Sequence, residues 1–189
     1  LSMTHDKNYE ATQYAIQVAK DNGCLISFAP NLRLSLWKTP EEARRRILYG
    51  MKQCDIMKIS EEEVAFVSEQ ESLEKGVSFI RDNSDIKILF VTLGNKGSIA
   101  YYKDEKIYCG GIHQEHVVDT TGAGDTFCGA VLSRILELGT DALTEKDIRE
   151  MLLFANAAAS IVVTRKGALC SMPEPEEIRA ATSLIDKVL

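Results

Sequence analysis

A glycine-containing turn carries the residues of this chain that are best suited to chemistry. Residues 118–127 read V-D-T-T-G-A-G-D-T-F. Apolar side chains then recur at helical spacing, at Phe127, Val131, Ile135 and Leu138, so the turn is predicted to open a helix over about 122–138. The first amides of a helix lack carbonyl partners, and glycine lets a ligand approach the backbone closely, so this turn is suited to holding an anion.

A carboxylate, that of Asp125, falls inside the first turn of this predicted helix. Because like charges repel, binding of a phosphate alone does not explain a carboxylate there. It is explained if Asp125 accepts the proton of a hydroxyl that attacks the phosphate, while the turn stabilises charge on the transferred group. The pattern therefore indicates phosphoryl transfer. The alternative is ordinary helix capping, for which Asp, Thr and Gly are also common.

A second glycine-containing turn, at residues 91–97, reads V-T-L-G-N-K-G. It follows the best strand candidate, residues 87–93, and open α/β sheets bind ligands at the carboxyl ends of their strands. Spacing alone favours a simple hairpin turn, since Asn and Gly tolerate positive φ. Residues 58–63 read K-I-S-E-E-E, in which Ser60 and Glu63 have the spacing of a capping box.

The elements expected to position these turns alternate between helix and strand. Periodicity predicts helices at about 9–21, 39–50, from 60, 73–81, 122–138 and 146–163, and strands at 24–29, 54–59 and 87–93. Residues 98–102 and 106–109 suggest a hairpin. This order indicates an α/β fold with a mostly parallel sheet and a small antiparallel addition. The sequence contains no repeat or linker, so we expect residues 1–189 to form a single domain.

Composition excludes several classes of function. The chain has 189 residues and a net charge of −6 without a basic stripe, so we expect no nucleic-acid partner. No apolar run has the length of a membrane span and no signal peptide is visible, so we expect no membrane partner. The 5 cysteines are dispersed, which argues against disulfides or a zinc site and for a reducing cytoplasm. The chain begins at Leu1 instead of Met, as expected of a piece of a longer protein.

The string D-T-T-G-A-G-D-T-F resembles the signature of the ribokinase-like (PfkB) carbohydrate kinases. The resemblance implies a three-layer ribokinase-like fold, with Asp125 as the catalytic base and Gly122, Ala123 and Gly124 as the anion hole. It also implies that T-L-G-x-x-G places Thr92, Gly94 and Gly97 near ATP.

Two earlier segments resemble further motifs of the family. K-I-S-E-E-E is similar to N-x-x-E, in which the Glu, here Glu63, organises Mg²⁺-bound water and Lys58 joins the nucleotide shell; Ser60 replaces the Asn. Residues 27–33, S-F-A-P-N-L-R, resemble F-D-P-N-x-R of fructokinase-type members, with Asn31 and Arg33 as implied sugar contacts. Ala29 stands where those members carry Asp.

The C-terminal segment resembles the part of the family that completes the nucleotide and cation sites. Asn156 would lie beside the nucleotide. A monovalent cation, K⁺, would be held mostly through backbone oxygens by Asp119, Thr121, Val162, Arg165, Gly167 and Ser171. Without the resemblance, Arg165 is equally well read as an ordinary cation at a helix C-terminus.

The resemblance covers the whole chain, but the family's N-terminal part, with its first strands, sugar-binding residues and β lid, has no counterpart. The implied function is transfer of the γ-phosphoryl group of ATP to a sugar, as in fructokinase. Ribose, 2-keto-3-deoxygluconate and nucleosides stay open as acceptors, and so does a non-catalytic nucleotide-binding remnant. We also expect self-association, for example a homodimer, through an apolar sheet edge left by the missing strands.

Overall fold

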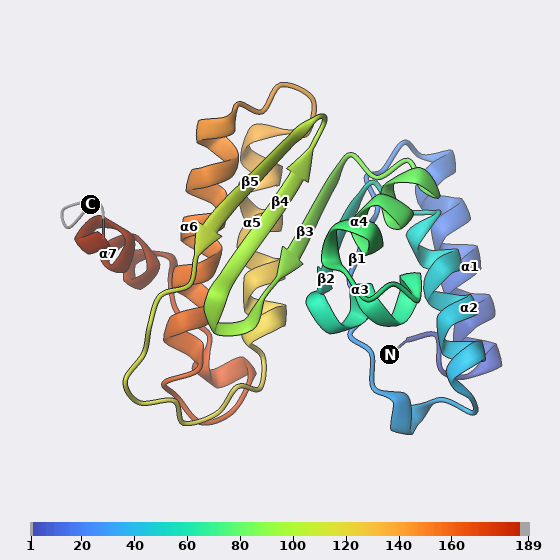
Figure 1. The fold of residues 1–189 in the computed structure, drawn as a ribbon, viewed down its shortest axis with the longest axis horizontal. Coiled ribbons are helices and arrows are strands. Elements are labelled where there is room, and N and C mark those ends of the chain that lie inside the picture. Colours follow the sequence, from blue (N-terminus) through green and yellow to red (C-terminus); the bar gives the residue numbers. More distant parts are fainter. Residues whose placement is uncertain (1, 186–189) are drawn as a thin grey trace. The chain divides into compact units, whose positions relative to one another are not determined.

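A computed structural model describes residues 2–185, in which helices and strands alternate (Figure 1). The helices are α1 (Asp6–Asp21), α2 (Pro40–Met51), α3 (Glu61–Ser68), α4 (Leu73–Asp82), α5 (Ala123–Leu138), α6 (Glu145–Val162) and α7 (Pro175–Ile185). The strands are β1 (Ser27–Phe28), β2 (Ile56–Ser60), β3 (Ile88–Thr92), β4 (Gly97–Tyr102) and β5 (Glu105–Gly110). Short 3₁₀ helices lie at Leu34–Leu36, Gly94–Lys96 and Leu169–Ser171.

The strands follow the sheet order β1-β2-β3-β4-β5. Strand β1 pairs in parallel with β2, with Ser27 opposite Ile56, whereas β4 pairs antiparallel with β5, with Gly97 opposite Gly110. The predicted α/β class with an antiparallel addition is confirmed. Strand β1 is shorter than the predicted 24–29, and Cys24 and Leu25 are exposed instead of buried.

The chain divides into two compact units, Leu1–Val91 and Thr92–Leu189, each described here by itself. In the first unit, α3 packs against α2, α4 and β2. Residues 88–91 of β3 are all buried, as expected of a strand covered on both faces. Helix α1 buries no residue and is held through an edge-to-face contact between Tyr9 and Tyr49 and through the buried Arg46, which bonds to Asp6.

In the second unit, α5 and α6 pack against each other and α6 covers β4 and β5 (Figure 1). The apolar face of α5 buries Phe127, Val131 and Ile135, in agreement with the predicted periodicity. Ala155, Ala157 and Ala158 of α6 are fully buried, and their small side chains allow neighbouring elements to approach closely. Helix α7 was not predicted from the sequence.

Three further findings concern the cysteines, the lengths of the helices and clusters of metal-binding side chains. All five cysteines are free thiols. Among the described residues, none of the helices combines the length and the apolar character needed to cross a bilayer. In the same part of the chain, no three His, Cys, Asp or Glu side chains gather in a way that could bind a metal ion.

Candidate functional site

The turn that precedes α5 has the geometry predicted for it. Gly122 is the N-cap residue and adopts φ +85°, a left-handed conformation that favours glycine. It supplies no side-chain cap, and the amide of Thr126 donates to its carbonyl oxygen at 2.8 Å. Helix α5 starts at Ala123, one residue after the predicted start.

The Asp125 side chain lies in the first turn of α5 and is exposed. The next two residues, Thr126 and Phe127, are buried and anchor this end of the helix in the core. The Thr126 hydroxyl is buried and has no hydrogen-bond partner among the described residues. The turn therefore presents a carboxylate to solvent at the positive end of a helix dipole.

Asp119 connects the turn before α5 to the loop after α6. Its two carboxylate oxygens accept hydrogen bonds from the amides of Thr121 at 2.9 Å and Gly167 at 3.2 Å. The amide of Val118 donates to the carbonyl of Val163 at 2.8 Å, which strengthens the same connection. Hydrogen bonds from the Thr121 side chain, then from the Thr121 and Gly167 amides, lower the pKa of Asp119 below its ordinary value.

The six residues predicted to bind a monovalent cation fall in the two segments that Asp119 connects. Three of their carbonyls each accept a hydrogen bond within the protein: that of Val162 from the Arg165 amide, that of Gly167 from the Ser171 hydroxyl, and that of Ser171 from the Arg165 guanidinium. A carbonyl oxygen has a second lone pair, so an oxygen-only ligand set of this kind still fits a hard cation. Arg165 also pairs with Glu177 at 2.5 Å.

The second glycine-containing turn lies between β3 and β4 and is tight. Gly94 and Gly97 have φ +60° and +107°, and the Leu93 amide donates to the Gly97 carbonyl at 2.8 Å. A Cβ atom at Gly97 would overlap the carbonyl oxygen of Cys109, so this position accepts only glycine. Thr92, which precedes the turn, is half-buried at the end of β3.

Asn156, on α6, is buried, with an exposed fraction of 7%. Its side-chain oxygen accepts from Ser98 at 2.9 Å, and its side-chain nitrogen donates to the carbonyls of Cys109 and Gly110 at 3.2 and 3.1 Å. The amide that the family resemblance places beside the nucleotide is thus engaged within the protein.

The remaining predicted residues lie in the first unit, where Glu63 connects two of the motifs. Its carboxylate accepts from the Ser60 amide at 2.9 Å, which confirms the predicted capping box, and from the Leu32 amide at 2.6 Å. Leu32 lies between Asn31, whose φ is +47°, and the exposed Arg33. Lys58 is half-buried on β2, two residues before the cap.

The predicted residues are therefore divided between the two units. The first contains Asn31, Arg33, Lys58 and Glu63; the second contains the turn at 92–97, the segment 119–125 and the segment 156–171. Sequence reasoning missed Leu32, which acts through its backbone amide, and Ser98, whose partner is on a distant helix. Leu32 occupies the variable position of N-x-R and Ser98 lies outside the motifs, so the identity of neither residue signalled its role.

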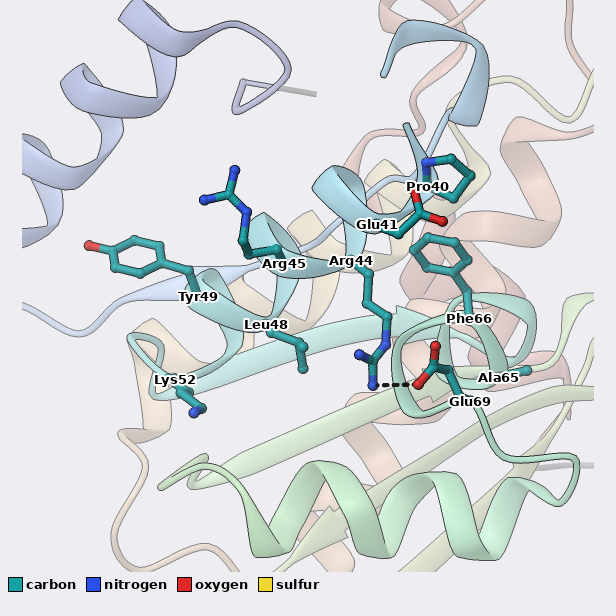
Figure 2. A pocket seen from close by; sticks show the side chains of 10 residues that line it. All are labelled: Pro40, Glu41, Arg44, Arg45, Leu48, Tyr49, Lys52, Ala65, Phe66 and Glu69. Atoms are coloured by element: carbon teal, nitrogen blue, oxygen red, sulfur yellow. Dashed lines mark ion pairs between the residues drawn. The ribbon is translucent and has the colours of Figure 1, made fainter. Parts of the chain in front are cut away.

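A groove of about 790 Å³ along α2 and α3 contains none of the predicted site residues. Arg44 lines it and is engaged by Glu69 at 3.1 Å and by the carbonyl of Val67 at 2.8 Å. Figure 2 shows Arg44 and Leu48 pointing to one side of α2 and Arg45 and Tyr49 to another, so these side chains do not converge on one point. We therefore place the candidate site at the glycine-containing turns.

Comparisons with known proteins connect these features to one group of enzymes. A family model described as pfkB family carbohydrate kinase matches residues 3–175. Fructokinase-1 of Oryza sativa subsp. japonica is 41% identical over 166 residues, which are 87% of this chain and 50% of that protein. Probable fructokinase-4 of Arabidopsis thaliana is 39% identical over 168 residues, 88% of this chain and 51% of that protein. The chain thus spans about half the length of these relatives.

Solved structures share the fold. A double mutant of fructokinase from Vibrio cholerae O395, bound to fructose, ADP and a potassium ion, superposes with a TM-score of 0.87 at 30% identity, over 96% of this chain and 57% of that one. A candidate ribokinase II from E. coli, in complex with ATP and Mg²⁺, superposes with a TM-score of 0.82 at 30% identity, over 97% of this chain and 56% of that one.

Proposed function

Since this chain belongs to the pfkB family of carbohydrate kinases, we propose that it is part of an ATP-dependent, fructokinase-like enzyme that phosphorylates a sugar hydroxyl. The family resemblance drawn from D-T-T-G-A-G-D-T-F is confirmed by that match, and the ribokinase-like fold by the solved structures. One observation carries the proposed chemistry: Asp125 is exposed in the first turn of α5, three residues after the N-cap Gly122, whose φ is positive.

Asp125 is the proposed general base. In this role its carboxylate accepts the proton of the acceptor hydroxyl as that hydroxyl attacks the γ-phosphorus, and the bond from phosphorus to the bridging oxygen of ADP breaks. The backbone of Gly122, Ala123 and Gly124 is the proposed anion hole, because the amides at a helix start and the helix dipole favour negative charge.

ATP is the proposed phosphoryl donor, with Thr92, Gly94 and Gly97 beside it. Mg²⁺, when bound, neutralises charge on the phosphates. Glu63 is proposed to organise Mg²⁺-bound water, and Lys58 is proposed to lie beside the nucleotide. Each carboxylate oxygen of Glu63 accepts a hydrogen bond from one backbone amide. A carboxylate oxygen can accept a further hydrogen bond, for example from a water molecule.

K⁺ is the proposed monovalent cation, held at the two segments that Asp119 connects. Its proposed ligands are oxygens of Asp119, Thr121, Val162, Arg165, Gly167 and Ser171. The oxygen-only set supports a hard cation, and the lowered pKa keeps Asp119 charged. Held there, the cation would fix the loop after α6 against the turn before α5.

Fructose is the proposed acceptor, with Asn31 and Arg33 as contacts, because the relatives at 39% and 41% identity are named as fructokinases. Ribose, 2-keto-3-deoxygluconate and nucleosides are the alternatives within the family. A panel of these acceptors, assayed with MgATP and the full-length protein, distinguishes them: fructose should give the highest kcat/KM.

Replacement of the proposed base tests the chemistry. Asp125→Asn in the full-length enzyme should lower kcat by about 10²–10⁴ and leave the Kd for MgATP within about threefold, because only proton transfer is lost. Glu176→Gln is the matched control, since it neutralises an exposed carboxylate in the first turn of α7. An unchanged kcat in Asp125→Asn would refute the assignment.

A second candidate function is nucleotide binding without turnover. The chain spans about half of its relatives, and Ala29 and Ser60 replace the Asp and Asn of the family motifs. Titration of the 189-residue chain with MgATP, in the presence and absence of fructose, separates the two functions. Binding without formation of sugar phosphate, in the full-length protein as well, would favour this second function.

A further inference from the structure

The side chain of Asn156 uses both of its donors inside the second unit. An amide nitrogen carries two N–H groups, and those of Asn156 donate to the carbonyls of Cys109 and Gly110 at 3.2 and 3.1 Å. The residue is 7% exposed, so its remaining acceptor capacity is also buried. In this arrangement Asn156 has no N–H group left for a ligand.

The hydroxyl of Ser98 determines which way the amide of Asn156 faces. Ser98 is completely buried on β4, and its hydroxyl donates to the Asn156 oxygen at 2.9 Å. If the amide were flipped, its oxygen would face the carbonyl oxygens of Cys109 and Gly110, which cannot donate a hydrogen bond. The network therefore assigns a single orientation.

The two carbonyls that Asn156 holds lie where the end of β5 contacts the turn at 94–97. A Cβ atom at Gly97 would overlap the carbonyl of Cys109, and one at Gly111 would overlap the carbonyl of Asn95. The Gly111 amide donates to the carbonyl of Lys96 at 3.1 Å. The turn and the end of β5 are therefore in direct backbone contact, and a shift of one requires a shift of the other.

From these contacts we infer that Asn156 is a positioning residue: it fixes the glycine turn at 94–97 through the carbonyls at the end of β5. This inference rests on the proposed function of that turn as a nucleotide site. Ser98 joins the arrangement as the residue that orients the amide.

Three variants of the 189-residue chain test the inference. Asn156→Asp keeps an acceptor for Ser98 but places a carboxylate against two carbonyl oxygens. Ser98→Ala removes only the orienting hydroxyl. Ser160→Ala is the matched control, because it removes a buried hydroxyl of the same helix that bonds only to the carbonyl of Ala157. The probe is MgATP, with the Kd measured by calorimetry, and hydrogen exchange is followed at the amides of Leu93 and Gly111.

We expect Asn156→Asp to raise the Kd for MgATP about tenfold or more and to accelerate exchange at both amides. Ser98→Ala should raise the Kd about threefold, as expected for the loss of one hydrogen bond. This variant also provides the test if Asn156→Asp does not fold. Ser160→Ala should change neither quantity. A residue with a purely structural role would lower the melting temperature and leave the Kd of the folded protein unchanged.

The inference is overturned if folded Asn156→Asp, or folded Ser98→Ala where the first does not fold, binds MgATP as the wild type does with unchanged exchange at Gly111. Failure of the wild-type chain to bind MgATP would instead contradict the nucleotide role proposed for the turn. The exchange rates would then still decide whether Asn156 holds the turn, so the two failures are distinguishable.

Discussion

Asp119 is the residue at which two loops of the second unit meet. Its carboxylate accepts hydrogen bonds from an amide of each loop, those of Thr121 and Gly167. Gly167 is 48 positions away in the sequence. The hydrogen bonds favour the charged form of the carboxylate, which is why they lower its pKa. The native state is therefore more stable when Asp119 is ionised.

Asp119→Asn should weaken this connection in a pH-dependent way. The asparagine nitrogen would face an amide donor, so one of the two hydrogen bonds is lost. Because the folded pKa lies below the ordinary value of 3.8, the contribution of Asp119 is fully present above that value and is lost as the pH falls through the folded pKa.

The measurement is the melting temperature of wild type and variant at pH 7 and near pH 3. The wild type should be more stable at pH 7, and the difference between the two should shrink toward pH 3. Other carboxylates, among them Asp147 and Glu177, also have lowered pKa values. Their contributions to stability are the same in both proteins and therefore cancel in the difference. A difference that stays constant across this range would contradict the role of the charged form.

At the scale of elements, the capped start of α3 is hydrogen-bonded to the loop at 31–33, which carries the proposed acceptor contacts. Ser60 caps the helix through its hydroxyl, which accepts from the Glu63 amide at 3.2 Å. Glu63 in return accepts from Ser60 and Leu32, so the position of the loop at 31–33 depends on the geometry of the cap. A serine can form the cap where the family motif has asparagine, since both residue types are preferred there.

Substitutions at Ser60 test this role. Ser60→Ala should lower the free energy of unfolding by about 1 kcal/mol, the usual cost of a lost N-cap, whereas Ser60→Asn should leave it within about 0.5 kcal/mol. Urea unfolding provides the measurement, and Ser72→Ala, which removes the cap of α4, is the matched comparison. Equal stability of Ser60→Ala and the wild type would exclude a capping contribution.

Elements whose signals are local could be predicted from the sequence. The start of the helix predicted at about 39–50, which Thr39 caps, the capping box at Ser60 and Glu63, and the periodic face of α5 each depend on residues within a few positions, and all three are confirmed. Contacts between distant residues could not be predicted. The hydrogen bond from Ser98 to Asn156 spans 58 positions, and no single-sequence pattern encodes it.

The extent of β1 shows the same limit. Residues 24–29 are nearly all apolar and read as a buried strand, yet only Ser27 and Phe28 pair with β2, and Cys24 and Leu25 are exposed. Hydrophobicity predicted a strand there, but the number of paired residues depends on the neighbouring strand. The predicted site residues follow the same rule: motifs predicted them one by one, and only the tertiary structure shows which segments are in contact, as Leu32 and Glu63 are.

At the scale of the whole molecule, the chain contains two compact units, and each carries some of the predicted site residues. The residues proposed for ATP are spread over both, at Glu63 in the first unit and at 92–97 and 122–125 in the second. The proposed sugar contacts are limited to Asn31 and Arg33, and the chain spans about half the length of the fructokinases it matches.

This distribution predicts that the 189-residue chain binds MgATP but does not phosphorylate fructose at a measurable rate. Phosphoryl transfer requires the acceptor hydroxyl to be held in line with the γ-phosphorus, and two contacts on one loop do not fix a sugar in that position. ADP release would be measured with and without fructose, with Asp125→Asn as the control for background hydrolysis. Fructose-dependent ADP release that disappears in Asp125→Asn would show instead that this chain contains a sufficient acceptor site.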